Sequence, residues 1–309
     1  MTTKFGVLLT QTCSWEELTT HAKTVEAAGF ESLWVADQIA NPFVATEWLE
    51  GWTALAGLAL ETESIRIGTL VTNIIYNNPV LIAKKAITVD QMSGGRLELG
   101  VGAGGAPTDH TMTGVPYWSG AERQRRFEEF VAIVEQLLTQ ESSSYEGEFY
   151  HLQDTYVSPA PLQSPRPPLV IAAHGPKSMR LAARKADKWS FYEPGSGLTG
   201  NQAADAMHKM NAYIDDEARA ADRDPESIER SFCCGFAASS AWESIDQALS
   251  DIKRYEAAGI NEFIVTYAPD EGFVTSEALD MQTGEIAASV FLRTPADLTA
   301  FAHAVRNRS

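Results

Sequence analysis

Short apolar runs typical of strands alternate with longer amphipathic runs typical of helices along the whole 309-residue chain. The strand-like runs lie at residues 5–10, 32–36, 65–71, 97–102, 169–173, 188–191, 231–237 and 262–267. Strands that are almost continuously apolar and alternate with helices predict a parallel sheet, because the connecting helices bury both of its faces. Eight such units favour closure of the sheet into an α/β fold, the (β/α)8 TIM barrel.

The pattern breaks between residues 140 and 168, after the fourth helix, which we expect at 121–138. Tyrosine, phenylalanine and proline alternate there with polar residues, which predicts a short insertion with a small hairpin in a single domain spanning 1–309. The alternative is an open doubly wound sheet. A dinucleotide-binding sheet of that kind needs a G-x-G-x-x-G turn after its first strand, and this sequence has none there.

The composition argues against several classes of partner. The formal net charge is −17, whereas nucleic acids and anionic membranes attract clusters of lysine and arginine. No run of 18 apolar residues exists, so we expect no membrane span. The three cysteines, Cys13, Cys233 and Cys234, lack zinc-binding spacing, and the six histidines show no metal-ligand pattern. We therefore expect a cytoplasmic protein without a metal site.

In a (β/α)8 barrel the active site lies where strands pass into loops at their C-terminal ends. This rule selects Asp37 and Gln38 after the second strand. It also selects Leu70, Val71 and Asn73 at the end of the third. Asp37 and Gln38 are polar directly after an apolar strand, so they either cap the turn or hydrogen-bond the edge of a bound ring.

The end of the fourth strand and the loop that follows it are dense in glycine from Gly100 to Gly105. Glycine there serves a tight turn, a close approach of the backbone to a flat ligand, or both. Thr108 and His110 follow in the same loop, and from this position His110 can reach the mouth of the barrel.

The fifth strand leads into the turn His174-Gly175-Pro176-Lys177-Ser178, which opens a helix. Proline in the first helical turn leaves backbone N–H groups free, and Lys177 and Ser178 add a charge and a hydroxyl donor. This composition is typical of a helix cap, and it also suits the phosphate of a cofactor tail.

Longer motifs in the third and fourth units resemble the bacterial luciferase-like superfamily. They are Ile-Gly-Thr-Leu-Val-Thr at 67–72, Asn78-Pro79, Ala-Lys-Lys-Ala at 83–86, and Asp-Gln-Met-Ser-Gly-Gly-Arg-Leu-Glu-Leu-Gly-Val-Gly-Ala-Gly at 90–104. The likeness covers most of the chain. It is closest to the short single-chain branch, which includes oxidoreductases that use coenzyme F420 (a deazaflavin) and others that use FMN.

The resemblance implies a barrel with a flavin-like ring in its mouth. It implies a non-proline cis peptide at Leu70–Val71 against the ring, with Asp37 and the loop Gly104–Thr108 around it, and a phosphate-binding turn at Gly175–Ser178. The cofactor-binding candidates are Asp37, Leu70, Val71, Asn73, Gly104, Gly105, Thr108, His174, Gly175, Pro176, Lys177 and Ser178. The catalytic candidates are Asp37, Gln38 and His110.

Two positions depart from the deazaflavin-dependent sugar-phosphate dehydrogenases of this superfamily. Those enzymes have a histidine where this chain has Gln38, and a glutamate where it has Gly105. Both changes remove groups that would act as base and acid on an alcohol, which argues against that particular reaction.

The sequence leaves three functions open. The first is F420-dependent hydride transfer to or from a small organic substrate. The second is an FMN-dependent monooxygenase supplied by a separate flavin reductase, and the third is a non-catalytic flavin-binding protein. The resemblance also implies a homodimer.

Overall fold

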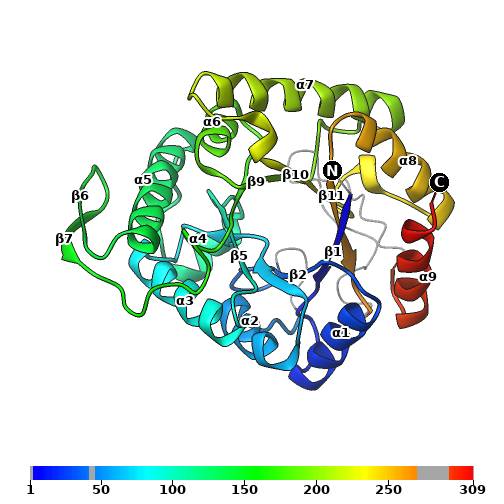
Figure 1. The fold of residues 1–309 in the computed structure, drawn as a ribbon, viewed down its shortest axis with the longest axis horizontal. Helices are drawn as coiled ribbons and strands as arrows, with labels where there is room; N and C mark the ends of the chain where they lie inside the picture. The colour runs from blue at the N-terminus through cyan, green and yellow to red at the C-terminus, as the bar shows by residue number, and fades with distance from the viewer. Residues whose placement is uncertain (1–2, 42–45, 270–291, 309) are drawn as a thin grey trace.

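The computed structural model describes residues 3–41, 46–269 and 292–308. Parallel strands form a central ring and helices surround it (Figure 1). The strands of the ring are β1 (Lys4–Leu9), β2 (Ser32–Val35), β3 (Arg66–Thr69), β4 (Thr72–Asn73), β5 (Leu97–Gly102), β8 (Leu169–Ala172), β9 (Lys188–Phe191), β10 (Glu229–Cys233) and β11 (Glu262–Tyr267).

The order of strands in this sheet is β3-β2-β1-β11-β10-β9-β8-β5-β4, and a further pairing of β3 with β5 closes the ring. β3 and β4 are two halves of one strand that is interrupted at Leu70 and Val71, because both halves pair with β5. The ring therefore has eight strand positions, one for each predicted run. The predicted (β/α)8 barrel is confirmed, and the open sheet is excluded.

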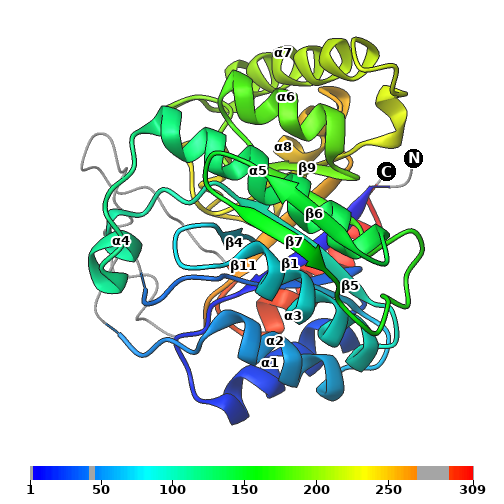
Figure 2. The ribbon, with the colours of Figure 1, turned by 90° about the vertical axis from the view of Figure 1, so that its left-hand side faces the viewer.

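The helices pack outside the ring. They are α1 (Trp15–Ala27), α2 (Gly51–Glu61), α3 (Pro79–Met92), α4 (Pro107–Thr113), α5 (Gly120–Thr139), α6 (Pro176–Lys185), α7 (Gly200–Arg219), α8 (Ile245–Ala257) and α9 (Pro295–Arg306), with short 3-10 turns η1 (Pro225–Ser227) and η2 (Ala238–Ser240). The sequence did not predict α4, which lies within the loop after β5. Figure 2 shows α4 at the end of the barrel opposite to the two termini.

The predicted insertion contains an antiparallel hairpin of β6 (Ser143–Glu146) and β7 (His151–Thr155), which forms a sheet separate from the barrel. In Figure 1 the hairpin lies outside α5, at the edge of the molecule. The hairpin between residues 140 and 168 is thus confirmed.

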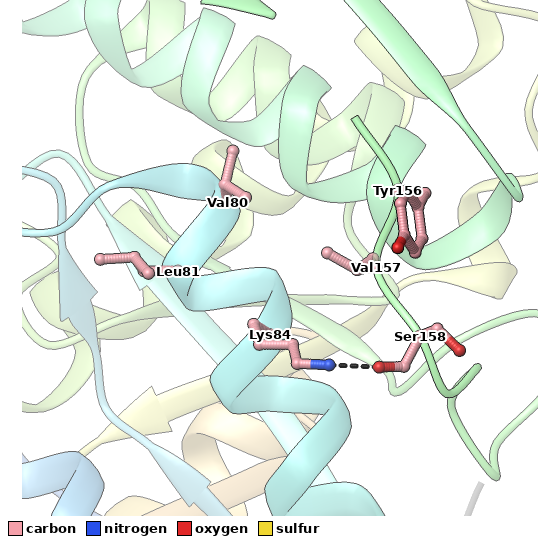
Figure 3. Close-up of a pocket in the computed structure, with 6 residues that line it drawn as sticks. All are labelled: Val80, Leu81, Lys84, Tyr156, Val157 and Ser158. Carbon is pink, nitrogen blue, oxygen red and sulfur yellow. Dashed lines mark hydrogen bonds between the residues drawn. The ribbon is translucent and has the colours of Figure 1, made fainter. Parts of the chain in front are cut away.

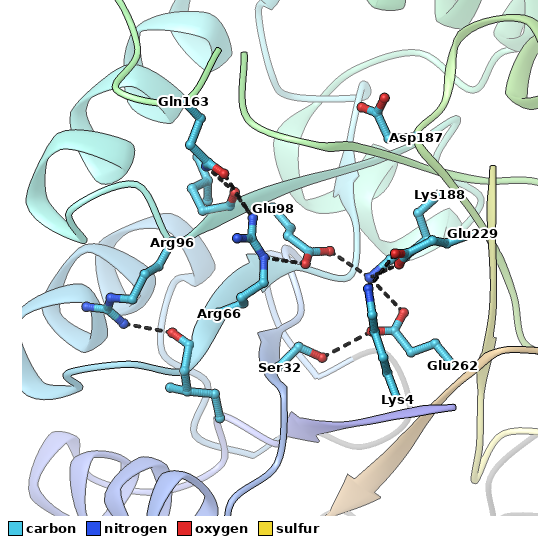
Figure 4. A network of polar contacts seen from close by, with 12 residues as sticks. Lys4, Ser32, Arg66, Arg96, Glu98, Gln163, Asp187, Lys188, Glu229 and Glu262 are labelled. Carbon is cyan, nitrogen blue, oxygen red and sulfur yellow. Dashed lines mark hydrogen bonds and ion pairs between the residues drawn. The ribbon is translucent and has the colours of Figure 1, made fainter. Parts of the chain in front are cut away.

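The N-terminal end of the barrel interior holds a cluster of paired charges (Figure 4). Lys188 Nζ lies 2.7 Å from Glu98 Oε2 and 2.8 Å from Glu262 Oε2, and all three side chains are buried. Arg66 Nε adds a second cation 2.6 Å from Glu98 Oε1. Burial alone would raise the pKa of Glu98, but Lys188 and Arg66 together lower it. Glu262 has fewer cationic partners, and burial leaves its pKa raised.

The first part of the motif at 90–104, from Asp90 to Arg96, also serves this end of the barrel. Arg96 donates to the backbone oxygens of Ala59 and Thr62, near the end of α2. Asp90 accepts backbone N–H groups of Leu162 and Gln163, where the chain returns from the hairpin. These residues tie helices and insertion to the barrel, so this part of the motif has a structural role.

Above the charged cluster, the barrel is filled by Trp34, whose indole Nε1 donates to Ser32 Oγ over 2.8 Å. An ideal Cβ on Gly68 would lie 2.5 Å from this indole ring, so glycine makes room for it. The apolar side chains packed with Trp34 are Leu8, Val170, Cys233, Ile264, Leu70 and Phe236. They form an apolar floor between the charged cluster and the C-terminal end.

Candidate active site at the C-terminal end of the barrel

Asp37, Asn73 and the short helix α4 meet at the C-terminal end of the barrel. Asp37 lies two residues after β2, and Asn73 ends β4. Asn73 Nδ2 donates to the backbone oxygen of Asp37 over 3.0 Å and to Asp109 Oδ2 of α4 over 3.3 Å. Neighbouring parallel strands end at the same edge, so the topology brings together residues far apart in the sequence.

The carboxyl group of Asp37 is buried, with a relative exposure of 2% for the residue. The Tyr76 hydroxyl donates to Oδ1 over 3.2 Å, and Asn77 Nδ2 donates to Oδ2 over 2.9 Å. Burial raises the pKa of Asp37 to about 7 and nearby Glu50 adds to the rise, whereas the two donors lower it. Asp37 therefore changes its charge near neutral pH.

Asp109 is a second buried carboxyl at this end, which the sequence analysis missed. It accepts a long hydrogen bond of 3.5 Å from the backbone N–H of Ile39, in addition to that from Asn73. Burial raises its pKa. Tyr76 and Asn77 were also missed as partners of Asp37. The sequence showed only that they lie shortly after the third strand. It could not show their role, because their contacts depend on how the loop folds back.

The peptide bond between Leu70 and Val71 is cis, at the position that the resemblance implied. Thr69 and Thr72 flank this bond in the sequence, and their hydroxyl oxygens lie 2.9 Å apart, within hydrogen-bond distance. The Trp52 indole Nε1 donates to Thr72 Oγ1 over 3.0 Å. Leu70 packs on the apolar floor of the barrel.

The glycines of β5 and of the loop that follows it have different roles. An ideal Cβ on Gly100 would lie 1.9 Å from the backbone oxygen of Thr69, and one on Gly104 would lie 2.8 Å from Ile75. Gly104 also has a φ of +70°, which favours glycine. These two glycines are thus required by the protein's own packing. A Cβ on Gly105 would have no atom within 4 Å, so only Gly105 faces open space among these three.

The turn from His174 to Ser178 opens α6, with Gly175 as N-cap and Pro176 at the first helical position. Lys177 is exposed. The Ser178 hydroxyl donates to the backbone oxygen of Gly175 over 2.9 Å. Ser178 is therefore engaged within the turn, whereas the first N–H groups of a helix have no partner inside it.

His174 lies on the solvent-exposed side of this turn and packs against Tyr192, with ring centroids 4.5 Å apart. Desolvation of the ring lowers the pKa of His174 to about 4, although the residue retains an exposed edge. The same direction follows from its hydrogen bond, because Nε2 accepts the backbone N–H of Tyr192 over 3.2 Å and must be unprotonated to do so.

The other candidates lie less centrally. His110 is buried on α4, where its ring packs against Tyr117 and Trp118, and its Nε2 is buried with no hydrogen-bond partner. His110 is therefore covered by aromatic rings rather than open to the mouth. Gln38 is half-buried, and Thr108 is exposed on the first turn of α4.

A shallow groove lies elsewhere, between α3 and the segment that leaves the hairpin (Figure 3). Its lining residues are Val80, Leu81, Lys84, Tyr156, Val157 and Ser158, and Lys84 Nζ donates to the backbone oxygen of Ser158. None of the candidate site residues lines this groove. It belongs to the helix layer, whereas the polar residues described above lie at the strand ends.

A family model described as luciferase-like monooxygenase matches residues 1–299. The chain belongs to this family. The F420-dependent hydroxymycolic acid dehydrogenase of Mycobacterium tuberculosis is 30% identical over 217 residues, which are 69% of this chain and 56% of that relative. An uncharacterised M. tuberculosis relative is 32% identical over 185 residues, which cover 62% of its length. The chain thus spans little more than half the length of these relatives.

Two solved structures share the fold of this luciferase-like protein. An F420-dependent secondary alcohol dehydrogenase, in complex with an F420–acetone adduct, matches with a TM-score of 0.75 and 19% identity, covering 86% of this chain and 93% of that chain. The monooxygenase RslO1 from Streptomyces bottropensis matches with a TM-score of 0.64 and 22% identity, covering 97% and 96%. At these identities the likeness shows the fold alone.

In residues 3–41, 46–269 and 292–308, no helix is long and apolar enough to cross a membrane. The same residues contain no group of three or more histidine, cysteine, aspartate or glutamate side chains placed to hold a metal ion.

Proposed function

We propose that this luciferase-like protein uses coenzyme F420 and passes a hydride to or from a small organic substrate. The observation that carries the proposal is the convergence of Asp37, the Gly104–Gly105 loop and the His174–Ser178 turn. These segments follow β2, β5 and β8, so all three lie at one end of the barrel. Two of the similar proteins above carry F420 in their names, which supports the choice of cofactor.

The described residues fit a flat cofactor with a phosphate-bearing tail. The open space at Gly105 and the apolar floor under Leu70 suit a planar ring. The exposed start of α6, with Lys177, suits a phosphate. When bound, a deazaflavin would supply the hydride chemistry itself. The protein's own residues then have to bind it, orient it and manage protons.

Asp37 can supply an acid–base group that Gln38 and Gly105 cannot. Those positions lack the histidine and glutamate of the sugar-phosphate dehydrogenases, yet Asp37 gives the site a group that holds or releases a proton near neutral pH. A reaction that needs one such group, for example reduction of an activated double bond, matches this set better than one that needs separate acid and base residues.

An FMN-dependent monooxygenase is the second candidate. Gln38 and Gly105 have no titratable side chains, which favours this candidate. When the cofactor carries out the chemistry, the reaction depends less on amino-acid bases. The similarity to RslO1 in fold is compatible with it. Such an enzyme would need a flavin reductase as a partner. We also propose a homodimer for either candidate, and light scattering tests it.

Absorbance titration of the purified chain with oxidised F420 and, in parallel, with FMN tests the proposal. We expect saturable binding of F420 and clearly weaker binding of FMN. Substrate-dependent oxidation of reduced F420 should then follow for at least one member of a panel of activated alkenes and carbonyl compounds. Binding of FMN without binding of F420 would favour the monooxygenase. Binding of F420 without turnover of any compound in the panel would favour a binding protein.

A further inference from the structure

Tyr76 and Asn77 hold the two oxygens of the Asp37 carboxyl group from one loop. Tyr76 contacts Oδ1 and Asn77 contacts Oδ2, so each oxygen has one neutral donor. Asn77 Nδ2 also donates to the backbone oxygen of Asn73 over 2.9 Å. Asn73 in turn donates to the backbone oxygen of Asp37. The loop and Asp37 therefore form one closed network of hydrogen bonds.

We propose that Tyr76 and Asn77 are positioning residues for Asp37, which fix the oxygen on which Asp37 holds a proton and set how readily that proton is lost. This proposal deepens the proposed function, because it names the parts of the site that control its acid–base group. It stands on the contacts between the three side chains.

The orientation of the Asn77 amide decides where the proton lies. Its nitrogen must face the Asn73 carbonyl oxygen, because two carbonyl oxygens cannot share a hydrogen bond. The same nitrogen therefore also faces Asp37 Oδ2, and a proton on Oδ2 would oppose an N–H group. Oδ1 faces the Tyr76 hydroxyl, which can donate or accept. The protonated form of Asp37 thus carries its proton on Oδ1.

Charged groups around Asp37 come from several elements. Glu50, the N-cap of α2, disfavours the charged carboxylate, and Lys85 of α3 favours it. Asp109 of α4 is linked to the network through Asn73. Tyr76 responds to both carboxyls, because burial, Asp37 and Asp109 together raise its pKa. Tyr76 therefore stays neutral, and its hydroxyl is available as donor and acceptor at every pH of interest.

The test is a pH titration of the Asp37 carboxyl carbon by ¹³C NMR in the free protein, assigned with Asp37→Asn. Tyr76→Phe removes a donor to the charged form, so we expect the pKa of Asp37 to rise by about 0.5–1 unit. Asn77→Ala should raise it as well. Glu50→Gln should shift it downward, because a like charge is removed. Tyr156→Phe, exposed in the groove of Figure 3, is the matched control and should leave it unchanged.

A purely structural role of Tyr76 would lower the melting temperature without moving this titration. An Asp37 pKa that shifts no more in Tyr76→Phe than in Tyr156→Phe would overturn the proposal. If Tyr76→Phe fails to fold, the opposite shifts in Asn77→Ala and Glu50→Gln decide, and equal or absent shifts count against it. The titration needs no cofactor, so its outcome is independent of whether F420 binds.

Discussion

The two ends of the barrel differ in whether their buried charged groups have oppositely charged partners. At the N-terminal end, Lys188 and Arg66 pair with the buried carboxylates of Glu98 and Glu262. At the C-terminal end, Asp37 is buried among neutral donors, and among the described residues no ion pair includes it. A buried charge is costly unless it is paired. The buried charges at the N-terminal end therefore need no further partner. At the C-terminal end, a ligand or a change of pH can alter the charge of Asp37.

The N-terminal end of the barrel thus serves stability, and the C-terminal end serves function. At the N-terminal end, the loss of any one charged residue of the cluster would leave its partner buried without an opposite charge. Each of these residues is therefore needed for the stability of the fold. At the C-terminal end, the raised pKa of Asp37 means that the folded protein bears a cost when Asp37 is ionised. Perturbed groups of this kind gather at functional sites.

Lys188→Met should destabilise the protein most. It leaves Glu98 and Glu262 buried and close together without their shared cation, which costs about 3–5 kcal/mol in comparable cases. Urea denaturation monitored by circular dichroism measures the loss. Lys23→Met breaks the exposed ion pair with Glu61 and should cost about 0–1 kcal/mol. Similar effects of the two substitutions would remove the distinction between the ends.

Asp37→Asn should change the pH dependence of stability. The pKa of Asp37 is raised in the folded state, from 3.8 to about 7, so its stabilising proton is fully present below the first value and is lost as pH rises through the second. Relative to the variant, the wild type should lose up to about 1.4 kcal/mol per pH unit between these values. Denaturation at several pH values measures the slope, with exposed Asp205→Asn of α7 as the baseline. A slope of the opposite sign would contradict the account.

Gly105→Phe should weaken cofactor binding without unfolding the protein. A side chain at Gly105 enters open space, so the melting temperature should change little, while F420 should bind at least about tenfold more weakly, or about 1.4 kcal/mol. Gly120→Phe, where a Cβ also meets nothing within 4 Å, is the control at the start of α5. Unchanged affinity in Gly105→Phe would show that the cofactor does not approach this loop.

Lys177→Glu should have the smallest effect. Lys177 is exposed, so its attraction for a phosphate is screened, and charge reversal should weaken F420 binding about threefold at low salt. The difference should shrink as salt is added. Calorimetric titration at two salt concentrations measures it. An unchanged dissociation constant at low salt would exclude Lys177 from the binding site.

The fold was predictable because its signals are local. The alternation of strands and helices depends on residues near each other in the sequence, and so does the capping box that Ser14 and Glu17 form at the start of α1. Differences arose where a special residue ends an element. The strand expected at 231–237 is β10, which ends at Cys233 before Gly235, where φ is +104°.

The site was predictable only in part. The rule that strand ends form the active site found Asp37 and Asn73, and the resemblance placed the cis bond at Leu70–Val71. Tyr76 and Asp109 were missed because their contacts join segments 36 or more positions apart. The sequence also could not show that Gly104 is required by packing against Ile75, whereas Gly105 is open.

Carboxyl ¹³C NMR of the protein with and without F420 tests the contrast between the two ends most directly. The account predicts that F420 moves the signal of Asp37 and its titration midpoint, while the signals of Glu98 and Glu262 stay where they are. Movement of Glu98 and Glu262 with Asp37 unaffected, or no movement at all under saturating F420, would contradict it.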